Sequence, residues 1–133
     1  MPVQLTETAL EALALVREKI DAEPACLDMH TFLEVRDGRV VACIAGHLAL
    51  QGAPLGELLK ADPADILRRG ADALDHLAVS AASFLFYSSS WPANYRLRFE
   101  RGTSSSDEAQ ITVDLLREIA ETGELWWAPS ARP

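Results

Sequence analysis

The 133-residue sequence contains only two cysteines, Cys26 and Cys43, and no apolar run near the length of about 20 residues that spans a bilayer. Two cysteines make no disulfide framework, and in a reducing compartment both side chains stay thiols. Glu7 and Glu11 interrupt any signal-peptide pattern at the N-terminus. These absences predict a cytoplasmic protein with no membrane partner.

Positive charge is also scarce, since 12 Lys and Arg residues stand against 20 Asp and Glu residues and give a net charge of −8. This acidic balance makes nucleic acid or an anionic membrane an unfavourable partner. The apolar and charged fractions, 49 % and 24 %, are ordinary for a globular protein. The length suits a single domain over residues 1–133, with residues 128–133 expected to form a frayed tail.

Motifs of catalysis are missing as well. The sequence has no glycine-rich phosphate loop, and the serines at 88–90 and 104–106 lack a surrounding Gly-x-Ser-x-Gly, so they are interpreted as caps and turns. His76 follows Asp72 by one helical turn, a pair that is typical of a solvated, ion-paired face. The sequence therefore favours a protein that is not an enzyme.

Residues 40–51 carry no charge, and as a helix they would be apolar on every side. Such a helix has to be surrounded by other elements. Gly52 follows it at the position where a left-handed conformation is common. Gly46 in its middle predicts a close approach by another helix backbone. We expect a mainly α fold, a compact bundle of four to six helices around this helix, with a possible short β pair.

The segments before this helix are less uniform. Residues 5–22 are predicted to be a helix that begins with a capping box at Thr8 and Glu11 and stops at Pro24. Its buried stripe is expected to be Ala9, Leu13, Val16 and Ile20. Residues 25–39 are expected to be a packed irregular segment, in which Asp37-Gly38 is a hairpin signal.

The segments after it alternate between helices and turns. We expect a short helical turn within 54–60, a helix opened by Asp62-Pro63, and a short helix over 81–88 capped by Ser80. Residues 95–100 alternate apolar and charged, which predicts a short exposed strand. The last helix is expected over 106–122, with a capping box at Ser105 and Glu108, and Gly123 after its end. Leu125-Trp126-Trp127 should fold back on the body.

Several of these features occur together in one order: a helix ending in proline, Leu27-Asp28-Met29, the run 42–47 (Ala-Cys-Ile-Ala-Gly-His), Leu85-Phe86, Trp91-Pro92, and a last helix ending near Gly123. In this order the chain resembles a group of small, uncharacterised bacterial and phage proteins. Members of that group often carry Cys-Gly-Thr ahead of the run, which completes a Cys-x4-Cys pair. Here residues 38–40 are Gly-Arg-Val, so the first cysteine is missing. The resemblance implies a fold and no activity.

Two copies of one spacing could hold a metal, Cys26-x3-His30 and Cys43-x3-His47. Zinc accepts two cysteines and two histidines, and an i, i+4 pair on a helix can point at one ion. The alternative is a pair of buried thiols and a core histidine hydrogen-bonded to a carbonyl. His47 needs a partner in either case, because an unsatisfied buried polar group costs about 1–3 kcal/mol. We expect no cofactor and keep zinc as the alternative.

We therefore predict a non-enzymatic protein-interaction or regulatory module that acts on a protein partner or on a second copy, as a homodimer. Aromatic and arginine side chains dominate binding hot spots, and the candidates here are Trp91, Tyr95, Arg96, Arg98, Trp126 and Trp127. The arginines favour an acidic partner or the chain's own acidic helices over nucleic acid. The alternative function is a metal-binding or catalytic protein that uses Cys43 and His47.

Overall fold

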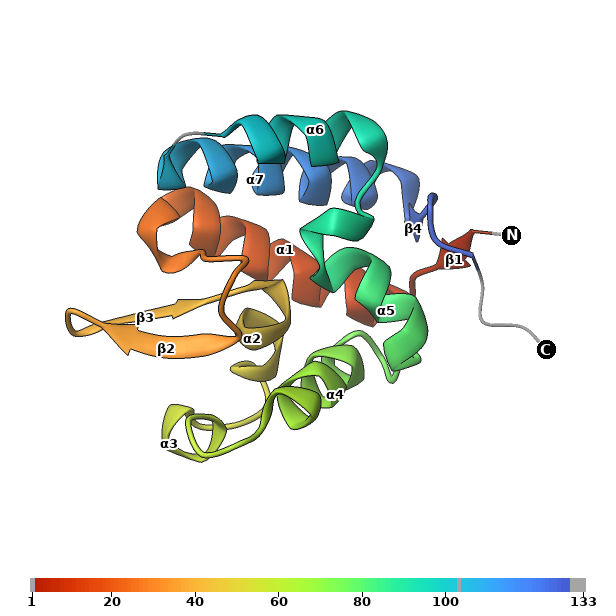
Figure 1. Cartoon of the computed structure of the whole chain (residues 1–133). Coiled ribbons are helices and arrows are strands. Elements are labelled where there is room, and N and C mark those ends of the chain that lie inside the picture. The colour runs from red at the N-terminus through yellow and green to blue at the C-terminus, as the bar shows by residue number, and fades with distance from the viewer. Residues whose placement is uncertain (1, 103, 130–133) are drawn as a thin grey trace.

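The computed structural model describes residues 2–102 and 104–129. These residues form a mainly helical fold with two small antiparallel sheets, which confirms the predicted fold class and the short β pair (Figure 1). The α-helices are α1 Glu7–Ala22, α2 Ile44–Ala49, α3 Leu55–Leu58, α4 Pro63–Ala73, α5 Val79–Phe86, α6 Ala93–Arg101 and α7 Ser105–Thr122. The strands are β1 Val3–Gln4, β2 Leu33–Arg36, β3 Arg39–Ala42 and β4 Glu124–Leu125, and two 3-10 turns are η1 Pro24–Cys26 and η2 Ser88–Ser90.

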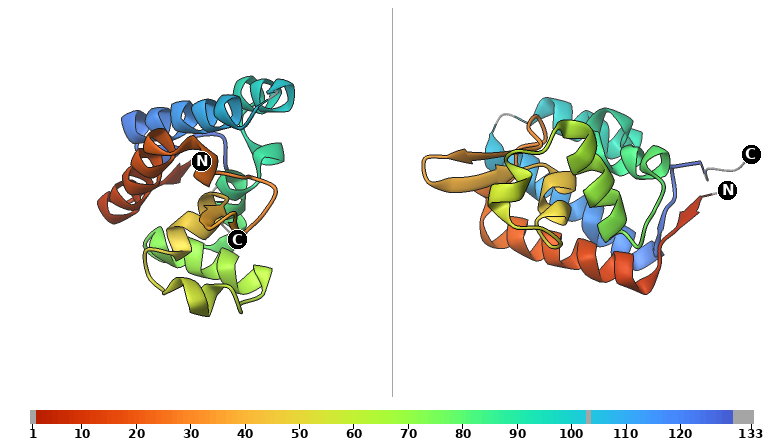
Figure 2. Two further views of the ribbon diagram at one scale, coloured as in Figure 1. Left: turned by 90° about the vertical axis from the view of Figure 1, so that its left-hand side faces the viewer. Right: turned by 90° about the horizontal axis from the view of Figure 1, so that it is seen from below.

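The helices lie in layers around α2. α1 packs along α7, α6 packs on α7, and α2 packs chiefly on α4 with further contacts to α1 and α5. Figures 1 and 2 show α6 and α7 on one side of the molecule and α3 and α4 on the opposite side. Among the residues described, no helix combines the length and the apolar character needed to cross a membrane.

The helix α1 buries the stripe that its sequence predicts. Ala9, Leu13, Val16 and Ile20 are all at most 3 % exposed. The predicted capping box is wrong in position, because the N-cap is Thr6, whose hydroxyl accepts a hydrogen bond from the Ala9 N–H at 3.2 Å. A threonine two residues earlier therefore opens the helix, in the same chemical role.

The prediction of one helix over residues 40–51 is wrong at both ends. Residues 39–42 are β3, and the helix α2 covers only Ile44–Ala49. β2 and β3 form the hairpin that the Asp37-Gly38 signal indicates, with φ of 52° at Asp37 and 76° at Gly38. Cross-strand pairing of the β-branched residues with β2 outweighs their continuation as a helix. All six α2 residues are buried, so the expectation of a surrounded helix holds.

Gly46 is approached by backbone, although not by the helix that its sequence context predicts. A β-carbon on Gly46 would overlap the carbonyl oxygen of Phe32, in the segment just before β2. The helix–helix approach is found instead at Gly70 of α4, where a β-carbon would lie 2.9 Å from the carbonyl oxygen of Ala45. Gly46 thus lets the backbone at Phe32 approach α2, and Gly70 lets α4 approach it from another side.

The predicted strand over residues 95–100 is wrong, since these residues belong to α6. Tyr95 and Phe99 are both 6 % exposed and lie one helical turn apart, whereas Leu97 between them is 43 % exposed. An apolar residue at every second position fits a strand and a helix alike over so short a stretch. In the helix, Phe99 packs edge to face on Trp91, at 5.2 Å between ring centroids, so the helix buries both of its aromatic residues in the core.

Several element boundaries also shift. α5 begins at Val79 and Ser80 lies inside it, so Ser80 is not the cap. The cap of α7 is Ser104, one residue before the predicted Ser105, and its hydroxyl accepts from the Asp107 N–H at 3.1 Å. Gly123 ends α7 in the left-handed conformation, as predicted, with φ of 74°. Asp62 caps α4 as predicted.

The chain after α7 folds back on the body, as expected. Leu125 is fully buried and pairs with Val3 across the sheet β1–β4. Ala128 is only 2 % exposed, which corrects the expected frayed tail from 128 onward; residues 130–133 of that tail lie outside the described residues. Figure 1 shows β1 and β4, the first and last strands, side by side.

Candidate functional site

The buried histidine of α2 is held by η1. His47 is 3 % exposed, and its Nε2 lies 2.8 Å from the carbonyl oxygen of Cys26. A carbonyl only accepts, so Nε2 carries the proton and Nδ1 has a free lone pair. Nδ1 is buried and has no hydrogen-bond partner among the described residues. Burial, together with the positive charge of Lys19, lowers the pKa of His47 to about 4, although the Cys26 carbonyl opposes this. The imidazole is therefore neutral at pH 7.

The other members of the predicted metal set point elsewhere. The Sγ of Cys26 lies 3.8 Å from the Lys19 carbonyl oxygen, and the Sγ of Cys43 lies 4.0 Å from the Phe32 carbonyl oxygen. Burial raises the pKa of both thiols. His30 is exposed and contacts the ring of Phe99, at 6.4 Å between centroids. Within residues 2–102 and 104–129, no three His, Cys, Asp or Glu side chains gather as a metal site.

The aromatic interaction candidates of α6 and the turn before it lie inside the protein. Trp91 is 1 % exposed and its indole N–H donates to the Leu85 carbonyl at 2.7 Å. Tyr95 is buried and its hydroxyl donates to the carboxylate of Glu118 at 2.5 Å. Burial and this carboxylate raise the pKa of Tyr95 to about 12. The structure therefore removes Trp91 and Tyr95 from the exposed patch that the sequence predicts.

The C-terminal tryptophans are partly covered by their own chain. Trp126 and Trp127 are half-buried and meet edge to face at 4.9 Å between ring centroids. The indole N–H of Trp127 donates to the carbonyl of Phe84 in α5 at 3.3 Å. These contacts hold an intramolecular flap, and the homodimer that rests on exposed rings stays a prediction.

The two arginine candidates differ in their partners. Arg98 donates to Asp114 of α7 at 2.9 Å, and its guanidinium lies 5.9 Å from the centre of the Tyr95 ring. It therefore pairs with the chain's own acidic helix, one of the two partners that the sequence favours. Arg96 is half-buried and forms no ion pair with any residue that the structure describes; it lines a pocket together with His30.

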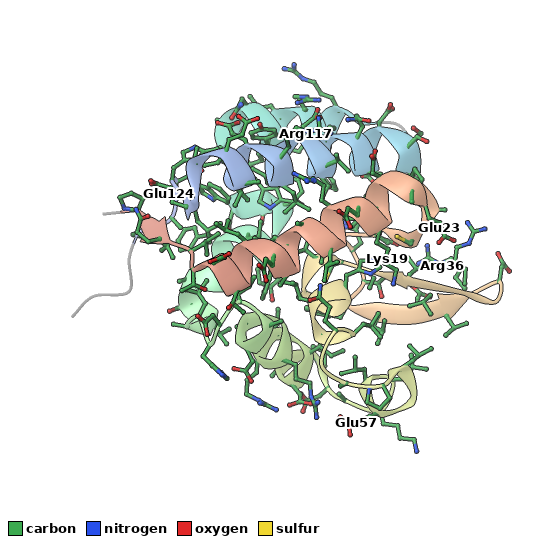
Figure 3. The ribbon with its side chains drawn as sticks, turned by 180° about the vertical axis from the view of Figure 1, so that it is seen from behind. Lys19, Glu23, Arg36, Glu57, Arg117 and Glu124 are labelled. Carbon is green, nitrogen blue, oxygen red and sulfur yellow. The ribbon has the colours of Figure 1, made fainter. Side chains whose placement is uncertain are left out.

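A surface that the sequence analysis missed lies between α1 and α4. Two adjoining hollows of about 350 and 380 Å³ share Gly52, Asp72 and Ala73, and together they form what we name the α1–α4 groove. Its α1 wall includes Ala12 and Leu15. Figure 3 shows both helices from the side opposite to Figure 1, with α1 running above α4. Leu15 is 56 % exposed, more than any other large apolar side chain in the described part of the chain.

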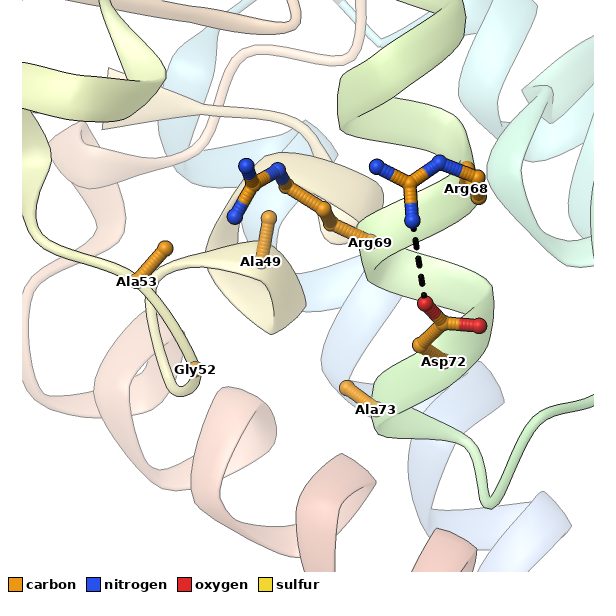
Figure 4. Close-up of a pocket in the computed structure, with 7 residues that line it drawn as sticks. All are labelled: Ala49, Gly52, Ala53, Arg68, Arg69, Asp72 and Ala73. Carbon is orange, nitrogen blue, oxygen red and sulfur yellow. Dashed lines mark hydrogen bonds and ion pairs between the residues drawn. The ribbon is translucent and has the colours of Figure 1, made fainter.

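The floor of the groove is formed by small residues. Figure 4 shows Ala49, Gly52 and Ala53 on one side of the first hollow, facing Arg68, Arg69, Asp72 and Ala73 of α4. The side-chain amide of Gln51 donates to the Ala12 carbonyl at 3.0 Å and so fixes the turn after α2 against α1. The floor is therefore made of small residues, and the Gln51 hydrogen bond holds it against the α1 wall.

The arginines at the groove are already neutralised. Arg68 pairs with Asp65 and with Asp72, the latter at 3.4 Å. Arg69 pairs with Asp65 and with Glu57, each at 2.8 Å. The hydrogen bonds from Arg69 and Arg68 lower the pKa of Asp65. Three carboxylates thus surround two guanidinium groups, and this end of the groove carries no excess of positive charge.

The α1 side of the groove has acidic side chains with no such partner in the described chain, and one of them, Glu11, lines the hollow itself. Glu7 and Glu11 lie eight and four residues before Leu15, and Glu18 lies three residues after it. All three are exposed and lie on one side of α1. None of them forms an ion pair with a residue described by the structure. A single signal in the sequence could have indicated this surface: Leu15 lies off the buried stripe of α1, among acidic residues.

Comparison with protein-family models, with curated proteins and with solved structures finds no match to this chain. The groove, the buried histidine and the pocket at Arg96 are therefore interpreted from their own geometry and chemistry.

Proposed function

We propose that this protein is a non-enzymatic interaction module whose α1–α4 groove binds a basic amphipathic helix of a protein partner. The observation that carries the proposal is Leu15, an exposed leucine at the edge of a floor of small residues and beside glutamates that form no ion pair with any described residue. Hollows between the helices of a bundle are a frequent place for binding sites. An amphipathic helix that lies in a groove is a recurring mode of peptide recognition.

The charge of the groove selects the partner. Glu11 lines the groove, and Glu7 and Glu18 lie on the same side of α1; none of the three forms an ion pair within the described chain, while Arg68 and Arg69 are held by acids of their own. Lysines or arginines that flank the apolar face of a partner helix would pair with these carboxylates and leave its apolar side chains on the floor. A second copy of this chain suits the groove less, because each copy carries a net charge of −8.

A synthetic peptide tests the proposal directly. The probe is a helix of about 18 residues with leucine at every third or fourth position and lysine elsewhere, labelled for fluorescence anisotropy. We expect micromolar binding that weakens with salt, since exposed charges are screened. The same peptide with glutamate in place of lysine should not bind. Equal binding of both peptides, or none of the basic one, would contradict the proposal.

Matched variants separate the groove from general attraction to an acidic protein. Leu15→Ser and Glu11→Lys should each weaken binding by about tenfold or more, the size of a modest hot spot. Leu97→Ser and Glu121→Lys change an exposed leucine and an exposed glutamate outside the groove, on α6 and α7. These two controls should bind as the wild type does. If Glu121→Lys weakens binding as much as Glu11→Lys, the attraction is non-specific and the groove is not the site.

Self-association of the protein is measured under the same conditions as the peptide titration. Light scattering over the concentration range of the titration should give the mass of a monomer. A dimer that Leu15→Ser dissociates, together with no peptide binding, would make a second copy the occupant of the groove and overturn the proposed partner.

A further inference from the structure

A second pocket, on the other side of the molecule, gathers charged groups of both signs. It encloses about 310 Å³ beside α6, whereas the groove is lined by α1 and α4. Figure 1 shows α6 and α4 on opposite sides of the molecule. Its polar lining comes from separate parts of the chain: His30, Ser88, Ser89, Arg96, Glu100 and Glu108. The turn before β2, the 3-10 turn η2, α6 and the first turn of α7 therefore meet at this pocket.

The charge of the pocket lining changes from positive to negative along α6. The serines of η2 precede α6 by only a few residues, and Arg96 lies in the first half of that helix. Glu100 lies one turn further on, next to Gly102. Glu108 reaches the same end, since a β-carbon on Gly102 would lie 3.4 Å from its Cγ. The pocket thus has a guanidinium and hydroxyl groups toward one end and two carboxylates toward the other.

These opposite charges are not satisfied by each other. Arg96, Glu100 and Glu108 form no ion pair within 4.0 Å with any described residue, although Arg96 and Glu108 are half-buried. The order arginine then glutamate at i, i+4 is the less favourable one on a helix. Arg98, two residues further along α6, does pair, with Asp114 of α7 at 2.9 Å. A pocket with a separated cation and anions is complementary to a ligand that carries both charges.

We propose that this pocket binds a small zwitterion of the peptide class, with its carboxylate at Arg96 and its ammonium group at Glu100 and Glu108. Residues four apart on a helix are separated by about 6 Å along the axis. The two charged ends of an extended dipeptide are separated by a similar distance, at about 3.3–3.6 Å per residue. The volume corresponds to about ten waters, which is room for a dipeptide.

The remaining groups complete the site. Ser88 and Ser89 can donate to the ligand carboxylate beside Arg96, and the serine hydroxyls also accept. The rings of His30 and Phe99, which contact each other at 6.4 Å, form an aromatic side to the pocket. This site goes beyond the proposed function of the groove and does not depend on it.

The test uses alanylalanine and two capped forms, in an NMR titration of the isotope-labelled full-length protein. The free dipeptide should shift the resonances of Phe99 and of the Arg96 side chain, with a dissociation constant of about 1 mM. N-acetylation removes the ammonium group and C-terminal amidation removes the carboxylate, and each should weaken binding by about tenfold. No shifts from the free dipeptide, or equal binding of all three forms, would overturn the proposal.

Two variants assign the ends of the ligand. Arg96→Gln should bind the free and amidated dipeptides equally, because the partner of the carboxylate is gone. Glu100→Gln should reduce the preference for the free over the acetylated form, and Glu100→Gln combined with Glu108→Gln should remove it, because both carboxylates face the ammonium group. Arg101→Gln changes an exposed arginine that does not line this pocket and should retain both preferences. If Arg96→Gln and Arg101→Gln behave alike, Arg96 does not bind the carboxylate and the assignment is wrong.

Discussion

The Nε2 atom of His47 lies 2.8 Å from the backbone oxygen of Cys26, so one side chain joins the buried helix α2 to the short turn η1. The bond requires a proton on Nε2, which the neutral ring carries in one of its two tautomers. Burial keeps the ring neutral by lowering its pKa to about 4. This contact makes His47 a structural group of the core whose protonation opposes folding.

Stability should fall as the pH is lowered through the range of this histidine. The unfolded chain, with a pKa near 6.5, binds the proton before the folded protein does, so stability is full above pH 6.5 and declines toward pH 4. Between pH 7.5 and 5 we expect a loss of about 2 kcal/mol in the free energy of unfolding. Urea denaturation at a series of pH values measures it.

The variant His47→Gln serves as the control for this pH dependence. It should be less stable than the wild type at pH 7.5, yet lose far less stability between pH 7.5 and 5. Asp65, whose pKa the hydrogen bonds from Arg69 and Arg68 lower, titrates below this window. Parallel pH profiles for variant and wild type would show that another group causes the decline.

Gly46→Ala should destabilise the protein by at least about 1–3 kcal/mol, because the new β-carbon would overlap the carbonyl oxygen of Phe32. Gly56→Ala in α3 is the matched control, since a β-carbon there meets nothing within 4 Å. The control should be neutral or more stable by up to about 1 kcal/mol, owing to the helix propensity of alanine. Equal urea midpoints for the two variants would contradict the close approach at Gly46.

Removal of metal should leave the melting temperature unchanged. Cys26, His30, Cys43 and His47 point at different partners, so a chelator has no shared ion to extract from them. Differential scanning fluorimetry with and without EDTA checks this, and Cys43→Ala should cost only about 1 kcal/mol for its small lost volume. Stoichiometric zinc in untagged protein, released together with a drop in melting temperature, would refute this prediction.

Leu125→Ala should cost about 2–5 kcal/mol, the range for a fully buried leucine. The loss would show that the C-terminal flap belongs to the core and not to an independent tail. Leu97→Ala, at a leucine that is 43 % exposed, should stay within about 0.5 kcal/mol of the wild type. Thermal unfolding of both variants measures the difference. A loss of stability for Leu125→Ala as small as that for Leu97→Ala would show that the flap contributes little to the core.

The features that the sequence determined by itself are local in their chemistry. The buried stripe of α1, the cap at Asp62, the left-handed end at Gly123 and the turn at Asp37-Gly38 all appear where the pattern predicts them. Each depends on backbone preferences and on side chains within about one or two helical turns. At residues 95–100 the alternation of apolar and charged residues predicted a strand, and this prediction was wrong because so short a pattern also fits a helix.

The tertiary structure alone decided the features that join distant segments. Val40 and Val41 form a strand because β2 lies beside them, and Tyr95 and Phe99 share a helix face because the core receives both. The partner of His47, the separation of Cys26 from Cys43, and the meeting of His30 with Arg96 at one pocket all involve residues far apart in the chain. Periodicity gives the face of an element that is buried, but not which element covers it, because that choice is made by packing all the faces at once.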